Sequence, residues 1–224
     1  MDRIKQSLAS LRFFIATAAG FVGFLFIMSV VGNPHVLIVR NGVDVLSSNG
    51  ASDQVFDELK SLDWDKKALS RGRIVNKQLR HNLNFGKEEV KQDLTSGIGS
   101  VIKFDNVPNL QGLHTGVMTM LHEHDPDFVE LRGEGNRYYN KTKCCINWHG
   151  DAERRVVIAA RFGATLPIRY LWHYKSKPVG KQFVAMLNHG DVYFMSEKAV
   201  GTDWARKNYL TLRHAAGCDG AMRK

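Results

Sequence analysis

The chain has 224 residues, of which 44% are hydrophobic, so it can bury one core and is expected to fold as a single domain. Its 31 Lys and Arg against 22 Asp and Glu give a net charge of +9, which favours polyanionic partners such as nucleic acid, a solvated basic face being the alternative. The three cysteines (Cys144, Cys145 and Cys218) have no metal-type spacing, and the adjacent Cys144 and Cys145 point to opposite faces of a strand and cannot easily bridge each other, so reduced thiols are predicted rather than a disulfide framework.

Residues 1–34 are expected to form an anchor or signal segment outside the folded domain. Within them, the uncharged apolar run 13–31 is long enough to cross a bilayer as a helix. Arg40 is the one cation close behind this run, whereas three precede it (Arg3, Lys5 and Arg12), a difference too small to decide which side of the membrane carries the domain. A cleaved signal peptide and a buried helix are the alternatives. The sequence thus predicts a single-pass membrane protein.

Residues 35–135 are expected to form a helical half of the domain that carries a substrate loop. Apolar residues at helical spacing predict helices over 53–62 and 110–121. Between them lies the polar, basic stretch 67–85. Its Arg80 and His81 are candidate substrate-binding residues on a lid, a solvated loop being the alternative.

In residues 136–224 the pattern changes to short apolar runs broken by glycine, proline and charge, which is typical of strands. Strands are predicted over 143–148, 156–162, 168–174, 182–187, 192–195 and 208–212. Two helices followed by a run of short strands predict an α+β domain, with the strands in a sandwich or rolled barrel.

The segment His149-Gly150-Asp151, directly after the first of these strands, is half of a candidate metal site. A His-x-Asp pair places an imidazole nitrogen and a carboxylate oxygen on one side of a metal ion. One distant histidine would complete the two-histidine, one-carboxylate face that leaves three positions of Fe(II) open. Alone the tripeptide is weak evidence, because a hydrogen-bonded pair in a surface loop has the same sequence.

The surrounding residues resemble the core of AlkB-like dioxygenases, in five elements that follow the family's order. These are Asn136-Arg137-Tyr138, His149-Gly150-Asp151, Phe162-Gly163, the Gly190-Asp191 pair opening a strand that ends at Met195, and the closing strand Asn208 to Arg213. The resemblance covers about residues 136–217. It implies an α+β domain with a double-stranded β-helix (jelly-roll) core behind N-terminal helices. It also implies Fe(II) and 2-oxoglutarate as cofactors of an oxidoreductase, with Asn136 and Tyr138 (or Tyr139) contacting the oxoacid.

The third metal ligand departs from the family's pattern. A histidine is expected shortly after the Gly-Asp strand, where residues 199–204 contain none; the only later histidine is His214. Adjacent strand residues point to opposite faces, so His214 and Arg213 cannot both face the metal without a bulge. In the register that we favour, His214 is the ligand and Arg223 binds the far carboxylate of 2-oxoglutarate. In the other, Lys207 and Arg213 bind that carboxylate and the metal lacks its second histidine.

Three functions agree with these residues. The one we predict is an AlkB-like oxygenase that removes N-alkyl groups from nucleic acid bases, which the charge of +9 favours because phosphate attraction supplies most non-specific affinity. The second applies the same chemistry to a protein or small molecule, which a membrane anchor suits better. The third is a membrane-tethered, non-catalytic β-helix protein that has lost iron. No obligate protein partner is inferred.

Overall fold

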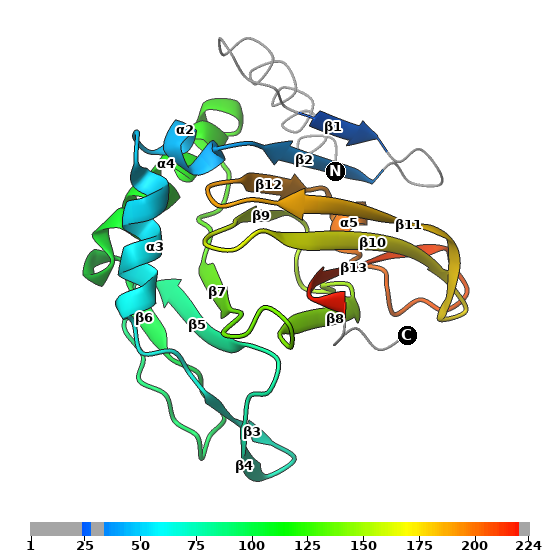
Figure 1. Cartoon of the computed structure of the whole chain (residues 1–224), viewed down its shortest axis with the longest axis horizontal. Helices are drawn as coiled ribbons and strands as arrows, with labels where there is room; N and C mark the ends of the chain where they lie inside the picture. Colours follow the sequence, from blue (N-terminus) through cyan, green and yellow to red (C-terminus); the bar gives the residue numbers. More distant parts are fainter. Residues whose placement is uncertain (1–23, 28–33, 220–224) are drawn as a thin grey trace.

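The computed structural model describes residues 24–27 and 34–219, and strands dominate them (Figure 1). Two four-stranded antiparallel sheets form the centre. One has the order β1 (Phe24–Ile27), β2 (His35–Val39), β12 (Val192–Met195) and β9 (Val157–Ala160). The other has the order β11 (Lys177–Leu187), β10 (Leu166–Tyr174), β13 (Thr211–Gly217) and β8 (Cys145–His149).

The two central sheets face each other across a shared apolar core. Along β10, Ile168, Tyr170 and Trp172 alternate with residues of the outer face, and all three are buried. They pack against Ile38 and Met195 of the opposite sheet. Because strand side chains alternate between faces, this one row of inward residues fixes which side of each strand faces the interior.

Helices cover the other face of the β2–β12–β9 sheet, as Figure 1 shows. They are α2 (Gly42–Leu46), α3 (Ala51–Ser61) and α4 (Pro108–His124), while the short α5 (Glu197–Val200) follows β12. The apolar side of α4 packs onto Val192 and Phe194 of β12. The approach between helices is close: a Cβ at Gly116 of α4 would lie 1.7 Å from the carbonyl oxygen of Leu46.

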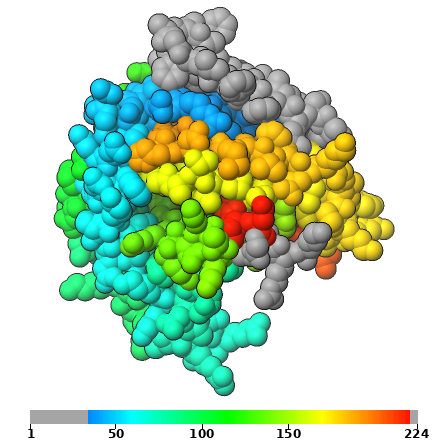
Figure 2. All heavy atoms as spheres, in the orientation of Figure 1, coloured from blue at the N-terminus to red at the C-terminus, as the bar shows by residue number. Residues whose placement is uncertain are grey.

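A third, smaller sheet lies beside the sandwich and has the order β6 (Val101–Lys103), β5 (His81–Gly86) and β7 (Gly133–Arg137). Its apolar side packs on Trp64 and on Phe104 of the 3-10 helix η1 (Phe104–Asn106). The hairpin of β3 (Lys67–Ser70) and β4 (Arg73–Asn76) projects from the body of the molecule next to it (Figure 2).

The predicted local elements are confirmed in their order and approximate places: α3 and α4 overlap the two expected helices, and β8 to β13 overlap the six expected strands. The bounds differ most for β11, which begins five residues earlier than expected, and for β13, which shares only residues 211 and 212 with its predicted range. The predicted fold class, an α+β domain with a helical first half, is wrong, because the described chain is mostly β-sheet. The stretch 67–85, expected as a polar loop, contributes β3, β4 and most of β5. β5 is a strand because it pairs with β7, which is distant in the sequence; in this pairing Asn82 stands opposite Asn136. Such pairing leaves no periodic signal within the stretch itself.

The predicted membrane anchor is also wrong. Residues 24–27, inside the apolar run 13–31, form strand β1, with Phe24 opposite Ile38 of β2. Across the described ranges, 24–27 and 34–219, no helix is long and apolar enough to cross a membrane, so a single-pass membrane protein is not supported. The rest of the run lies outside the described residues. A short apolar run is compatible with a strand as well as with a helix, so hydropathy alone could not distinguish the two and the predicted helix was wrong.

Candidate metal centre

Two neighbouring strands bring the three expected ligands together. His149 is the last residue of β8, Asp151 follows two residues later, and His214 lies within β13. In the antiparallel pairing of these strands His214 stands opposite His149, and their ring centroids are 4.3 Å apart. The turn is tight: a Cβ at Gly150 would lie 2.2 Å from the carbonyl oxygen of Gly201, so the residue between the first two ligands has to be glycine.

The donor atoms of this triad fit a single metal ion. His149 Nε2 lies 3.4 Å from Asp151 Oδ1, and His214 Nε2 lies 4.0 Å from Asp151 Oδ2. One ligand atom from each residue can be chosen so that all lie within 4.8 Å of one another. Metal–ligand bonds of about 2.0–2.2 Å place neighbouring donors roughly 3 Å apart, so a small inward movement would close the site. Two imidazoles and one carboxylate are the donor set of non-haem Fe(II) oxygenases.

The hydrogen bonds and the burial of the three candidate ligands suit metal binding. His149 Nδ1 donates a hydrogen bond to the carbonyl oxygen of Asn147 at 2.7 Å, which leaves the Nε2 lone pair toward Asp151. Burial, reinforced by His149, lowers the pKa of His214 to about 4, so its ring is neutral. Burial alone would raise the pKa of Asp151, but its contacts with His149, His214 and Arg154 lower it overall, so the carboxylate is ionised.

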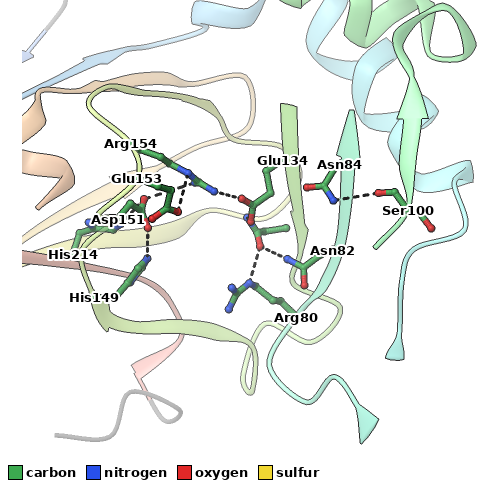
Figure 3. Close-up of polar contacts among 11 residues, drawn as sticks. Arg80, Asn82, Asn84, Ser100, Glu134, His149, Asp151, Glu153, Arg154 and His214 are labelled. Atoms are coloured by element: carbon green, nitrogen blue, oxygen red, sulfur yellow. Dashed lines mark hydrogen bonds and ion pairs between the residues drawn. The ribbon is translucent and has the colours of Figure 1, made fainter. Parts of the chain in front are cut away.

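A polar network connects the triad to the third sheet (Figure 3). Arg154 Nη1 lies 3.7 Å from Asp151 Oδ2, and the same guanidinium pairs with Glu134 of β7. Glu134 in turn accepts a hydrogen bond from Asn136 at 3.3 Å. Arg154 therefore lies between the metal-binding carboxylate and a strand of a different sheet.

The structure places the other expected site residues around this network. Asn136 Oδ1 accepts hydrogen bonds from Arg80 and Asn82, each at 2.7 Å, so Arg80 lies at the far end of the network from Asp151. The ring of Tyr138 lies under the Arg161 guanidinium, 5.5 Å from its centre. His81 does not join the network; its ring stacks on Tyr139 at 4.3 Å.

Of the two arginines expected to bind the oxoacid, Arg213 does not face the triad. His214 and Arg213 point to opposite faces of β13, and the Arg213 guanidinium lies over Trp204, 5.4 Å from the ring centre. The structure thus puts His214 next to Asp151 and turns Arg213 away from it. Arg223 lies outside the described residues.

Residues that the sequence interpretation missed also line the site. Arg154 was not singled out, and Tyr170 and Tyr193 looked like ordinary core residues. Tyr170 is fully buried next to His214, with ring centroids 6.3 Å apart, and its hydroxyl has no hydrogen-bond partner among the described residues. Its signal in the sequence was weak: alternation along β10 predicts that Tyr170 faces inward, but not what it faces.

Fold and site together define a mostly β protein with a candidate two-histidine, one-carboxylate metal centre between strands of its sandwich. No family model matches the chain. It is 44% identical to "Uncharacterized protein R156" of Acanthamoeba polyphaga mimivirus over 185 residues, which make up 83% of this chain and 70% of the viral protein. The chain belongs to the same family as this viral protein, whose name states no activity.

Proposed function

We propose that the protein is an Fe(II)- and 2-oxoglutarate-dependent dioxygenase of the AlkB-like type. The observation that carries this proposal is the convergence of His149, Asp151 and His214, contributed by two strands and one turn, with their donor atoms on one site. Three protein ligands on one face leave the other positions of a six-coordinate ion open. When bound there, Fe(II) with 2-oxoglutarate would activate O2, so that one oxygen atom would enter a C–H bond of the substrate while the other would enter the succinate formed, with loss of CO2, from 2-oxoglutarate.

The chain's own contribution is to hold and orient these donors. The carbonyl oxygen of Asn147 sets the orientation of His149, and burial keeps His214 neutral. Leu212, two residues before His214 on β13, and Ile168 of the neighbouring strand β10 are buried members of the sandwich core on one side of the site.

The substrate we propose is an N-alkylated base in nucleic acid. The net charge of +9 supports it, together with cationic residues on the projecting β3–β4 hairpin and just before β5 (Lys67, Arg71, Arg73, Lys77 and Arg80). Because this attraction is electrostatic, 2-oxoglutarate turnover should increase with methylated single-stranded oligonucleotide and fall steeply with salt. Turnover that responds to neither would favour the same chemistry on a protein or small molecule.

The chemistry itself is tested by mixing the protein with Fe(II) and 2-oxoglutarate without oxygen and recording the visible charge-transfer band of the chelate. The band is expected in the parent protein and should be lost in His149→Ala and in His214→Gln, which keeps most of the buried volume. His122→Ala, which removes an exposed histidine on α4, is the matched control and should keep the band. Absence of the band from a folded parent protein would contradict the proposal and favour a non-catalytic role.

A further inference from the structure

Arg161, directly after β9, lies on the strand face that looks into the sandwich. Its neighbours Ala160 and Phe162 pack against the core under the helices. Val157, on the alternate side of the strand, packs into the core between the two sheets. Hydrogen bonding to the segment that leads into β12 continues past the end of β9, since the backbone N–H of Arg161 donates to the carbonyl oxygen of Asp191 at 2.8 Å. Strand alternation therefore extends to Arg161 and directs its side chain toward the interior.

Arg161 has no carboxylate partner in the described residues, in contrast to three other covered arginines; Arg213 has none either, but its guanidinium lies over Trp204. Arg40 pairs with Asp191, Arg154 with Glu134 and Arg169 with Asp219. In the described part of the chain, the guanidinium of Arg161 instead donates twice to one backbone oxygen, that of Ala164, at 3.0 and 2.7 Å. A carbonyl oxygen leaves the net charge of the guanidinium uncompensated.

Burial makes this unpaired charge costly, and it lowers the pKa of Arg161. A covered charge is stable in proteins chiefly when an opposite charge accompanies it. At least two N–H groups of the planar guanidinium remain after the bonds to Ala164, enough for the paired hydrogen bonds that arginine makes to a carboxylate. Arg161 is therefore suited to an anionic ligand that enters the interior.

Two tyrosines place this cation in the same interior as the metal site. Tyr193 of β12 stands opposite Ala159, two residues before Arg161. Burial raises the pKa of Tyr193 to about 12, and its hydroxyl is close enough to feel both the Arg161 cation and the Asp151 carboxylate. On the opposite sheet, Tyr170 lies next to His214 with its buried hydroxyl unpartnered in the described residues.

We propose that Arg161 binds the far carboxylate of 2-oxoglutarate, with the hydroxyls of Tyr193 and Tyr170 as further hydrogen-bond donors. This rests on the proposed function, since the oxoacid end of the same molecule would bind at the metal. It replaces Arg213, which the fold turns away, and gives the covered guanidinium its missing counter-charge. A dicarboxylic oxoacid fits such a site, whereas an oxoacid without the second carboxylate would leave Arg161 unpaired.

The test compares two oxoacids by calorimetric titration, without oxygen, into the full chain loaded with Mn(II). One is 2-oxoglutarate; the other is 2-oxobutyrate, which has the same chelating end but no second carboxylate. Arg161→Gln should weaken 2-oxoglutarate binding about 10- to 100-fold, the worth of hydrogen bonds between charged groups, and leave 2-oxobutyrate binding unchanged. The affinity of Arg161→Lys for 2-oxoglutarate should lie between those of the parent and Arg161→Gln, because lysine keeps the charge but not the planar pair of donors. Arg213→Gln is the matched control and should bind both acids as the parent does.

Three other outcomes would overturn the assignment. If Arg161→Gln retains the preference for 2-oxoglutarate while Arg223→Gln loses it, the far carboxylate binds elsewhere and the proposed function still stands. If Arg161→Gln weakens both acids equally, its role is structural; circular dichroism and the unfolding temperature would show the accompanying change. If the metal-loaded parent binds neither acid, the proposed function fails together with this inference.

Discussion

Replacement of Arg154 by Gln tests whether the polar network supports the metal centre. The guanidinium has two opposing effects on metal affinity: it holds Oδ2 of Asp151 in place, and its positive charge repels a cation. Its pairing with Glu134 offsets that charge, so the repulsion is largely cancelled while the hold on Asp151 remains. We therefore expect Arg154→Gln to weaken metal binding.

The magnitude follows from the geometry. Unit charges at the 3.7 Å separation of Arg154 and Asp151 attract by about 1 kcal/mol in a medium like water and by about 4 kcal/mol at an effective dielectric constant near 20. The Arg154 side chain is 40% exposed, so the lower end applies. About 1–1.5 kcal/mol corresponds to roughly a tenfold loss of metal affinity, in the range usual for groups that orient metal ligands.

The assay is an anaerobic Co(II) titration followed by visible absorption, in the parent and in Arg154→Gln, Arg154→Lys and Arg155→Gln. Arg155 is the exposed neighbour, so its variant removes the same charge away from the site and should bind as the parent does. Arg154→Lys keeps the positive charge but not the planar, two-pronged guanidinium, so its metal affinity should lie between those of the parent and Arg154→Gln. Unchanged or tighter binding in Arg154→Gln would refute the reasoning, since it would mean that the guanidinium acts only as a repelling charge.

The remaining predictions concern stability. Gly116→Ala should lower the free energy of unfolding by at least about 3 kcal/mol, because its Cβ would meet the carbonyl oxygen of Leu46. Gly112→Ala, at a position of the same helix with open space, should raise it by about 0.5–1 kcal/mol. Equal effects of the two variants in urea titrations would contradict this packing. Burial lowers the pKa of His173 below 6.5, so the folded state binds a proton less readily than the unfolded chain, and stability is lost as pH falls below about 6.5. His173→Gln should reduce that loss, by no more than about 1.4 kcal/mol per pH unit, between about pH 7.5 and 5.5; an unchanged slope would assign it to other groups. Co(II) at about 100 times its Kd should stabilise the parent by about 2.7 kcal/mol, reversibly with a chelator, but not His214→Gln; a gain in that variant would place the ion elsewhere.

The sequence alone determined those features that depend on short-range pattern. Helical spacing located α3 and α4, and short apolar runs located β8 to β13. The tripeptide at His149 predicted two of the three candidate ligands, because its histidine and carboxylate are neighbours in the sequence and stand among elements in a recognisable order. The alternation of side chains along a strand also predicted that His214 and Arg213 would face opposite ways, but it left open which of them faces the metal.

Only the tertiary structure decided which distant segments meet. The apolar run 13–31 reads as a membrane helix, yet its residues 24–27 form a strand, because pairing with β2 determines their conformation. The polar stretch before residue 86 becomes sheet because β7 supplies its partner. Arg154 and Arg161 are ordinary residues in the sequence. Their importance comes from what the fold places beside them. Arg154 lies beside the carboxylate of the candidate metal site, and Arg161 has no carboxylate partner in the described residues. Such long-range contacts leave no trace in local periodicity.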